Sequence, residues 1–254
     1  IFRDFPDVFS EEYRENARIS AQALAARKDD PLMIGYFLRN EPSWAFVNNL
    51  VVADEVLYNP EDTVCKEELI KTLKEKYITI DALNTAWNAR FDSFDDLKKS
   101  QAHVSEWSES SNADMKAFSR RMISEYVSVP SKACREVDKN HMILGMRWAW
   151  ISDPDLAVGW ENFDVFSINC YSFNPSIDMD FAVKAGVDRP ILIGEFHFGA
   201  LDRGLPATGL KGVKNQIERA KALRSFIEKT AEHPYGVGTH WFQFHDQFSL
   251  GRMD

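Results

Sequence analysis

The chain has 254 residues, of which 44% are hydrophobic and 13% aromatic, so it can bury a sizeable core and is neither a disordered segment nor a mini-protein. Its 30 basic and 39 acidic residues leave a formal net charge of −9, which argues against nucleic acid as a partner. The apolar runs fall well short of the roughly 20 residues that cross a bilayer, so we expect no membrane partner. Cys65, Cys134 and Cys170 are widely spaced and indicate neither a disulfide framework nor a zinc site.

The first third of the chain changes its periodicity twice. Apolar residues at three- and four-residue spacing predict a helix between Ser10 and the break at 29–31. The next segment, Leu32 to Leu38, is short and almost wholly apolar, as in a parallel strand buried on both faces. The polar, helix-rich stretch that follows at 50–111 is interpreted as a helical insertion after this strand.

Four later segments repeat the pattern of an apolar run that ends in aromatic, amide, histidine or carboxylate residues. They are Met142 to Trp150, Asp164 to Tyr171, Pro190 to Phe198, and Tyr235 to Phe244. Helical patterns lie between them, one through Met115 and Tyr126 before Pro130 and one from Val213 to Ile227. Alternating strands and helices predict an α/β fold with a parallel sheet, and we assign residues 1–254 to one domain.

Two glutamates follow or end predicted strands, where parallel α/β folds bind their ligands. Glu41 comes directly after the first strand, and Glu195 lies within an apolar strand, where a charge is costly unless it is paired or used. Each could instead be a surface carboxylate. A pair of carboxyl groups with nearby aromatic rings is what glycoside hydrolysis requires, and Asn40 and Trp241 could contact the sugar.

Several segments resemble the clan A retaining glycoside hydrolases. The segment IGYFLRNEP at 34–42 resembles the Asn-Glu signature of their fourth barrel strand, and IGEF at 193–196 resembles the signature of strand seven. Within the clan, the segments GEFHFGALDRG at 194–204 and HWFQFHDQ at 240–247 are most similar to the family 50 β-agarases. The segment KEKYITIDALNTAW at 74–87 is also similar to part of the family 42 β-galactosidases.

The resemblance implies a (β/α)8 barrel and a double displacement with retained configuration. Glu195 would be the nucleophile, Glu41 the general acid and base, and Asn40 a ligand of the sugar 2-hydroxyl. Further substrate-binding candidates are Tyr171, His197, His240 and Trp241. The implied substrate is a β-galactosidic galactan such as agarose, no cofactor or metal is implied, and we expect the protein to be secreted or periplasmic.

Other interpretations remain open at this stage. The protein could act on small β-galactosides, or it could be a carbohydrate-binding barrel fragment without activity. A metal cluster could form from Glu195, His197, His240, His245 and Asp246. The segments present correspond to strands four to eight, so we also expect a barrel that is truncated at its N-terminus.

Overall fold

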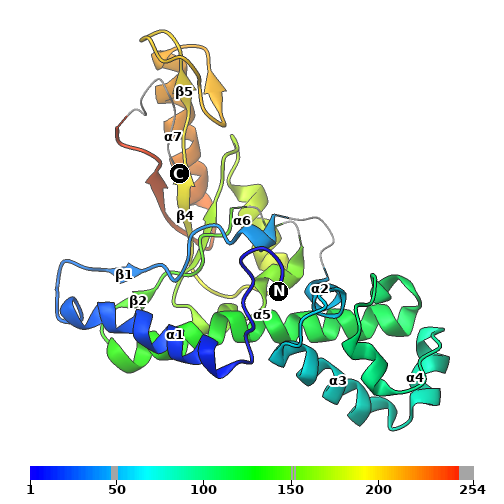
Figure 1. The fold of residues 1–254 in the computed structure, drawn as a ribbon. Helices are drawn as coiled ribbons and strands as arrows, with labels where there is room; N and C mark the ends of the chain where they lie inside the picture. The colour runs from blue at the N-terminus through cyan, green and yellow to red at the C-terminus, as the bar shows by residue number, and fades with distance from the viewer. Residues whose placement is uncertain (47–50, 150, 152, 246–254) are drawn as a thin grey trace. The chain divides into compact units, whose positions relative to one another are not determined.

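The computed structural model describes residues 1–254 apart from 47–50, 150, 152 and 246–254 (Figure 1). The chain divides into two compact units. We call Ile1–Ile34 with Pro42–His141 the helical unit, and Gly35–Glu41 with Met142–Asp254 the strand unit. None of the helices in the described part of the chain is long and apolar enough to span a membrane.

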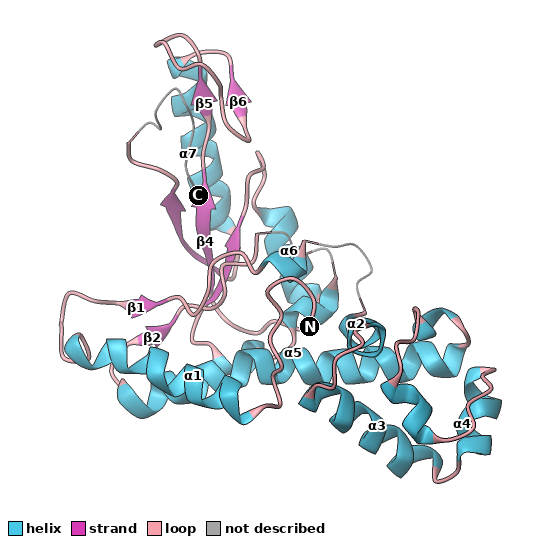
Figure 2. Ribbon diagram, viewed as in Figure 1, coloured by secondary structure: helices cyan, strands magenta, loops and turns pink. Residues whose placement is uncertain are grey.

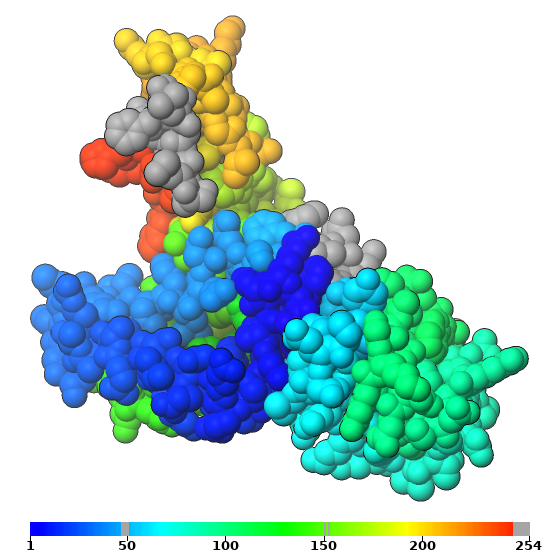
Figure 3. Space-filling model, in the orientation of Figure 1, coloured from blue at the N-terminus to red at the C-terminus, as the bar shows by residue number. Residues whose placement is uncertain are grey.

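The described residues of the helical unit form five α-helices, joined by loops and short 3-10 turns (Figure 2). They are α1 (Glu11–Ala21), α2 (Val52–Tyr58), α3 (Val64–Tyr77), α4 (Ile80–Trp87) and α5 (Glu109–Val137). Side-chain oxygens of Ser10, Thr63, Thr79 and Ser108 cap α1, α3, α4 and α5 at their first turns. The first helix begins and ends within its predicted range, and most of its residues lie at the surface (Figure 3). The predicted 50–111 segment is helical as expected; its status as a separate insertion stays a prediction.

The prediction that a helix ends before Pro130 is wrong, because α5 continues through that residue to Val137. A proline inside a helix has no N–H to donate to the carbonyl four residues earlier, here that of Tyr126. The structure supplies another donor, since the Tyr13 hydroxyl donates to the Tyr126 carbonyl at 2.8 Å. The hydroxyl of Tyr13, a residue of α1, therefore replaces the backbone hydrogen bond that Pro130 cannot make.

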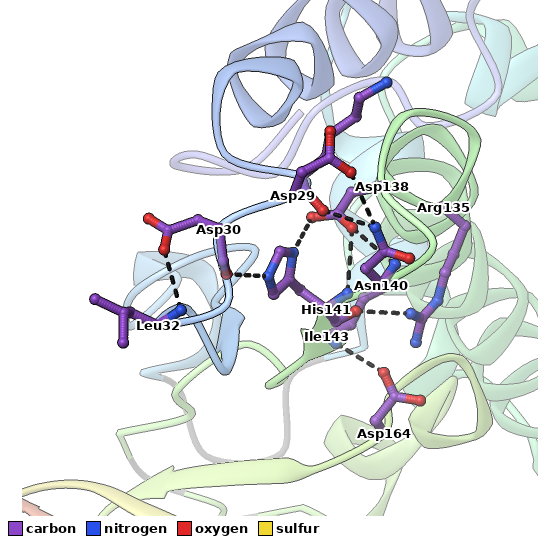
Figure 4. Close-up of polar contacts among 10 residues, drawn as sticks. Asp29, Asp30, Leu32, Arg135, Asp138, Asn140, His141, Ile143 and Asp164 are labelled. Atoms are coloured by element: carbon purple, nitrogen blue, oxygen red, sulfur yellow. Dashed lines mark hydrogen bonds and ion pairs between the residues drawn. The ribbon is translucent and has the colours of Figure 1, made fainter.

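The turn after α5 is held by a buried ion pair, Asp138 with His141 (Figure 4). His141 Nδ1 lies 2.7 Å from Asp138 Oδ2, and its Nε2 lies 2.9 Å from the Asp30 carbonyl. Both neighbours are acceptors, so both ring nitrogens donate, and these bonds raise the pKa of His141. Burial alone would raise the pKa of Asp138, but its bonds from His141 and from the backbone N–H of Asn140 lower it overall.

The strand unit holds the five predicted strand segments as shorter, parallel strands. They are β1 (Gly35–Tyr36), β2 (Met142–Ile143), β3 (Phe166–Asn169), β4 (Ile191–Phe196) and β7 (Gly236–Trp241). The described pairs are β1 with β2, and β3 with β4 and β7. A parallel bridge between Trp148 and Ile168 connects the segment after β2 to β3. The strands therefore neighbour one another in chain order, and the closed barrel with strands four to eight stays a prediction.

Two helices and a small ribbon accompany these strands. The helices are α6 (Ser176–Lys184) and α7 (Gln216–Glu232), and the ribbon pairs β5 (Gly199–Ala200) with β6 (Gly212–Val213). The predicted helix at 213–227 is thus confirmed as α7, except that Val213 belongs to β6. Every residue of β3 and β4 is buried, which matches the two-faced burial inferred from their apolar runs. The same inference is wrong for the first segment, because Leu32 and Ile34 are 91% and 65% exposed and β1 itself is only half-buried. Trp150, the predicted end of one segment, lies outside the described residues.

Candidate active site

Glu195 is held at the carboxyl end of β4 with only 6% of its surface exposed. Arg147 Nη2 donates to its Oε1 at 2.7 Å, and the Tyr171 hydroxyl donates to its Oε2 at 2.5 Å. Burial and the Glu195 carboxylate raise the pKa of Tyr171, so the phenol remains a donor. A buried carboxylate with a cation bonded to one oxygen and a hydroxyl bonded to the other is fixed in orientation.

Glu41 follows the end of β1 by five residues and is half-buried, with a backbone φ of 46°. Its backbone N–H donates to the Arg147 carbonyl at 3.3 Å. Asn169 Nδ2 donates to Glu41 Oε1 at 2.7 Å and lies 3.5 Å from the Asn40 side-chain oxygen. Glu41 is thus held by a neutral amide where Glu195 is held by a cation.

The two glutamates are brought together through Asn169. This residue lies opposite Glu195 in the register of β3 and β4, while its side chain reaches Glu41. Sequence reasoning placed both glutamates at strand ends, and the structure places both in one site.

Arg147 and Asn169 are the site residues that sequence reasoning missed. Each is a polar side chain in an otherwise apolar strand segment, the same signal that singled out Glu195. Arg147 is 21% exposed at its side chain and Asn169 is 1% exposed. Applying the Glu195 criterion to every strand end would have found both.

His197 packs against Tyr171, with ring centroids 4.8 Å apart. Its Nδ1 donates to the Phe242 carbonyl at 3.1 Å, and its Nε2 accepts the Leu210 N–H at 2.9 Å. This pattern requires a neutral ring, and burial lowers the pKa of His197 accordingly. Since both ring nitrogens are engaged, His197 supports the ring of Tyr171, and its predicted contact with a sugar hydroxyl stays untested.

His240 and Trp241 end β7 near the same strands. The His240 ring meets Phe37 edge-on at 6.0 Å. Trp241 meets Phe196 edge-on at 5.3 Å, and the Arg219 guanidinium lies 5.0 Å from its ring centroid. A cation therefore lies over one face of the indole, and a sugar platform on Trp241 would use the other face.

The metal-site alternative draws no support from the geometry. Among the residues that the structure describes, no group of three or more His, Cys, Asp or Glu side chains is arranged to hold a metal ion. Asp246, which belonged to that proposed cluster, lies outside the described residues.

Comparison with known proteins gives a consistent set of similarities. The model of glycoside hydrolase family 42, beta-galactosidase, matches residues 3–188. Beta-agarase B of Vibrio sp. (strain JT0107) is 32% identical over 97% of this chain, which spans 27% of that protein. Two solved structures are similar over 94% of the chain: an agarase at 30% identity with a TM-score of 0.84, and an exo-beta-agarase at 28% with 0.86. The chain covers 35% and 33% of those two proteins.

Proposed function

Because this chain belongs to the beta-galactosidase family of glycoside hydrolases, family 42, we propose that its protein hydrolyses β-galactosidic bonds of a galactan such as agarose. One observation carries the chemistry: Glu195 is held by Arg147 and Tyr171, whereas Glu41 is held by the amide of Asn169. The choice of galactan rests on the similarity to beta-agarase B and to the agarase structures.

The proposed reaction is a double displacement with retained configuration. A Glu195 oxygen attacks the anomeric carbon while the bond to the leaving oxygen breaks and Glu41 gives that oxygen its proton. The glycosyl ester on Glu195 is then cleaved by water, whose proton returns to Glu41. Asn40, exposed beside Glu41, is the amide we assign to a sugar hydroxyl.

The second candidate is hydrolysis of small β-galactosides, which the match to the beta-galactosidase family model favours. A binding fragment without activity is disfavoured, because both carboxyl groups are present and each has a hydrogen-bond partner. We further propose that the protein is secreted or periplasmic, since a polysaccharide substrate lies outside the cell, and fractionation of producing cells tests this location.

The full-length protein is to be incubated with agarose, porphyran and an aryl β-galactoside, with release of reducing ends measured for the polysaccharides. New reducing ends from agarose support the galactan proposal. Activity on the aryl galactoside alone would instead assign the protein to small galactosides. Proton NMR of the first product tests the mechanism, because an inverted anomer would contradict double displacement.

Substitutions test the assigned roles. We expect Glu195→Gln to abolish turnover of all substrates, because the variant has no carboxylate nucleophile. Glu41→Gln is expected to lower kcat/KM by about 10²–10⁴-fold for substrates with poor leaving groups and to spare kcat/KM for those that need no protonation. We expect kcat to fall for both kinds of substrate, because Glu41 no longer takes the proton from water in the second step. The control is Glu228→Gln, an exposed glutamate on α7 that pairs with Arg224 and should retain full activity. Wild-type activity in Glu195→Gln would refute the nucleophile assignment.

A further inference from the structure

Arg147 contacts both segments that carry the glutamates. Its Nη2 donates to Glu195 Oε1 at 2.7 Å and to the Gly194 carbonyl at 2.9 Å. Its backbone carbonyl accepts the Glu41 N–H at 3.3 Å. One residue thus orients the Glu195 carboxylate by its side chain and the Glu41 backbone by its main chain.

The conformation of Arg147 is one that residues with side chains rarely adopt. Its φ is +50°, in the left-handed region. The Ser167 hydroxyl oxygen accepts its backbone N–H at 2.9 Å, and its guanidinium lies 5.0 Å from the centroid of the Phe37 ring. A backbone conformation of this kind persists only where surrounding contacts hold it. Here Ser167, Phe37 and Glu195 all contact Arg147. Strain of this kind clusters at functional sites.

Gly194 has no side chain, and the Arg147 side chain packs in the space that a Cβ atom at this position would fill. A Cβ atom at this position would lie 3.0 Å from Arg147 Nε and 2.7 Å from Asn169 Oδ1. The side chain that holds Glu195 and the one that holds Glu41 therefore pack against the same glycine. Any larger residue at 194 would displace both at once.

We propose that Arg147 is a positioning residue that sets the geometry of both carboxyl groups, with Gly194 as the gap that admits it. This inference rests on the proposed function, since it assigns a role within that reaction. In this role the guanidinium takes no part in making or breaking bonds. Its effect is to hold the Glu195 carboxylate in one orientation before attack.

The test compares Arg147→Met, Arg147→Lys and Gly194→Ala in the full-length protein with an aryl β-galactoside. We expect kcat to fall about 10- to 100-fold in Arg147→Met, the cost of losing a charged hydrogen bond, with KM changed less than about threefold. Arg147→Lys should recover part of the loss, because it keeps the charge but not the two contacts. Arg224→Met, which removes an exposed arginine that pairs with Glu228 in the same unit, is the matched control and should behave as wild type.

A pH profile separates positioning from a loss of structure. In Arg147→Met we expect the acidic limb of kcat/KM to move to higher pH, because a buried carboxylate loses the cation that contacts it at 2.7 Å. Among the other groups at this site, Tyr171 stays protonated and His197 stays neutral, so neither produces this shift. Glu41 and His240 also lie here, and burial and Arg147 lower the pKa of His240, so the Glu195 carbon signal described below identifies the group that titrates. In Gly194→Ala, kcat should also fall, but less than in Arg147→Met, because the Arg147 and Asn169 side chains shift and are not removed.

An unchanged kcat and acidic limb in folded Arg147→Met would overturn the proposal. If that variant does not fold, as judged by circular dichroism, Arg147→Lys decides: wild-type kcat and pH profile there would overturn the proposal equally. If the wild-type protein hydrolyses neither the galactans nor the aryl β-galactoside, the proposed function fails. The role of Arg147 is then still tested by a carbon NMR titration of the labelled Glu195 carboxyl group. The Glu195 signal, assigned by its loss in Glu195→Gln, must then titrate at higher pH in Arg147→Met or Arg147→Lys than in wild type, and an identical midpoint would refute the role.

Discussion

Replacing Tyr13 by Phe tests how the helical unit accommodates a proline inside its longest helix. The hydroxyl of Tyr13 donates to the Tyr126 carbonyl, which Pro130 cannot serve. Phe keeps the ring, and with it the stacking on Tyr126 at 6.5 Å, so the change removes little besides the hydrogen bond.

The expected cost follows from the burial of the two partners. A net hydrogen bond contributes about 1 kcal/mol, and a carbonyl left unpaired in a fully dry site costs about 1–3 kcal/mol. Tyr126 is 4% exposed but Tyr13 is only half-buried, so water can partly replace the lost donor. We therefore expect Tyr13→Phe to lower the free energy of unfolding by roughly 1–1.5 kcal/mol, near the lower end of that range.

The decisive comparison uses Pro130→Ala as a second background. Alanine restores the backbone N–H that can donate to the Tyr126 carbonyl, so the helix no longer depends on Tyr13. Tyr13→Phe should then cost less than about 0.5 kcal/mol, which makes the coupling energy of the cycle roughly 1 kcal/mol.

Urea unfolding followed by far-ultraviolet circular dichroism measures all four proteins. Tyr58→Phe is the control for loss of a hydroxyl, because Tyr58 is 55% exposed. An equal loss of stability from Tyr13→Phe in the wild-type and Pro130→Ala backgrounds would refute the reasoning, since the hydroxyl would then stabilise the protein without serving this carbonyl.

Two further predictions concern titratable groups. Tyr171→Phe should lower kcat about 10- to 100-fold by removing the hydroxyl bond to the buried Glu195 carboxylate; a change below twofold would contradict this role. Because the pKa of His141 is raised in the folded protein, its stabilising effect is complete below the usual value of about 6.5 and is lost as pH rises through the folded value. The urea concentration at the unfolding midpoint should therefore fall more between pH 6 and pH 9 in wild type than in His141→Asn. An equal fall in the two proteins would contradict this role of His141.

Local pattern was sufficient for the elements whose formation depends on nearby residues. Two apolar runs marked the strand segment that precedes Glu41 and the one that contains Glu195. They placed Glu41 after its strand and Glu195 near the carboxyl end of β4. The helix that follows Ser10 was also predicted, because its cap and periodicity are both local. The end of α5 was not, since the donor that replaces the Pro130 N–H comes from Tyr13, far away in the chain.

The amino-acid composition permitted a large core and excluded a disordered chain. The residues at the predicted strand ends indicated an acid–base site of two glutamates. The family resemblance implied a role for each glutamate, whereas the different surroundings of the two carboxyl groups became visible only in the folded chain. Arg147, Tyr171 and Asn169 reach the glutamates from other strand segments, across pairings that no local pattern encodes. Hydrophobic periodicity reports how a segment meets the core, whereas the charge and orientation of a buried carboxylate depend on atoms that only the folded chain brings near.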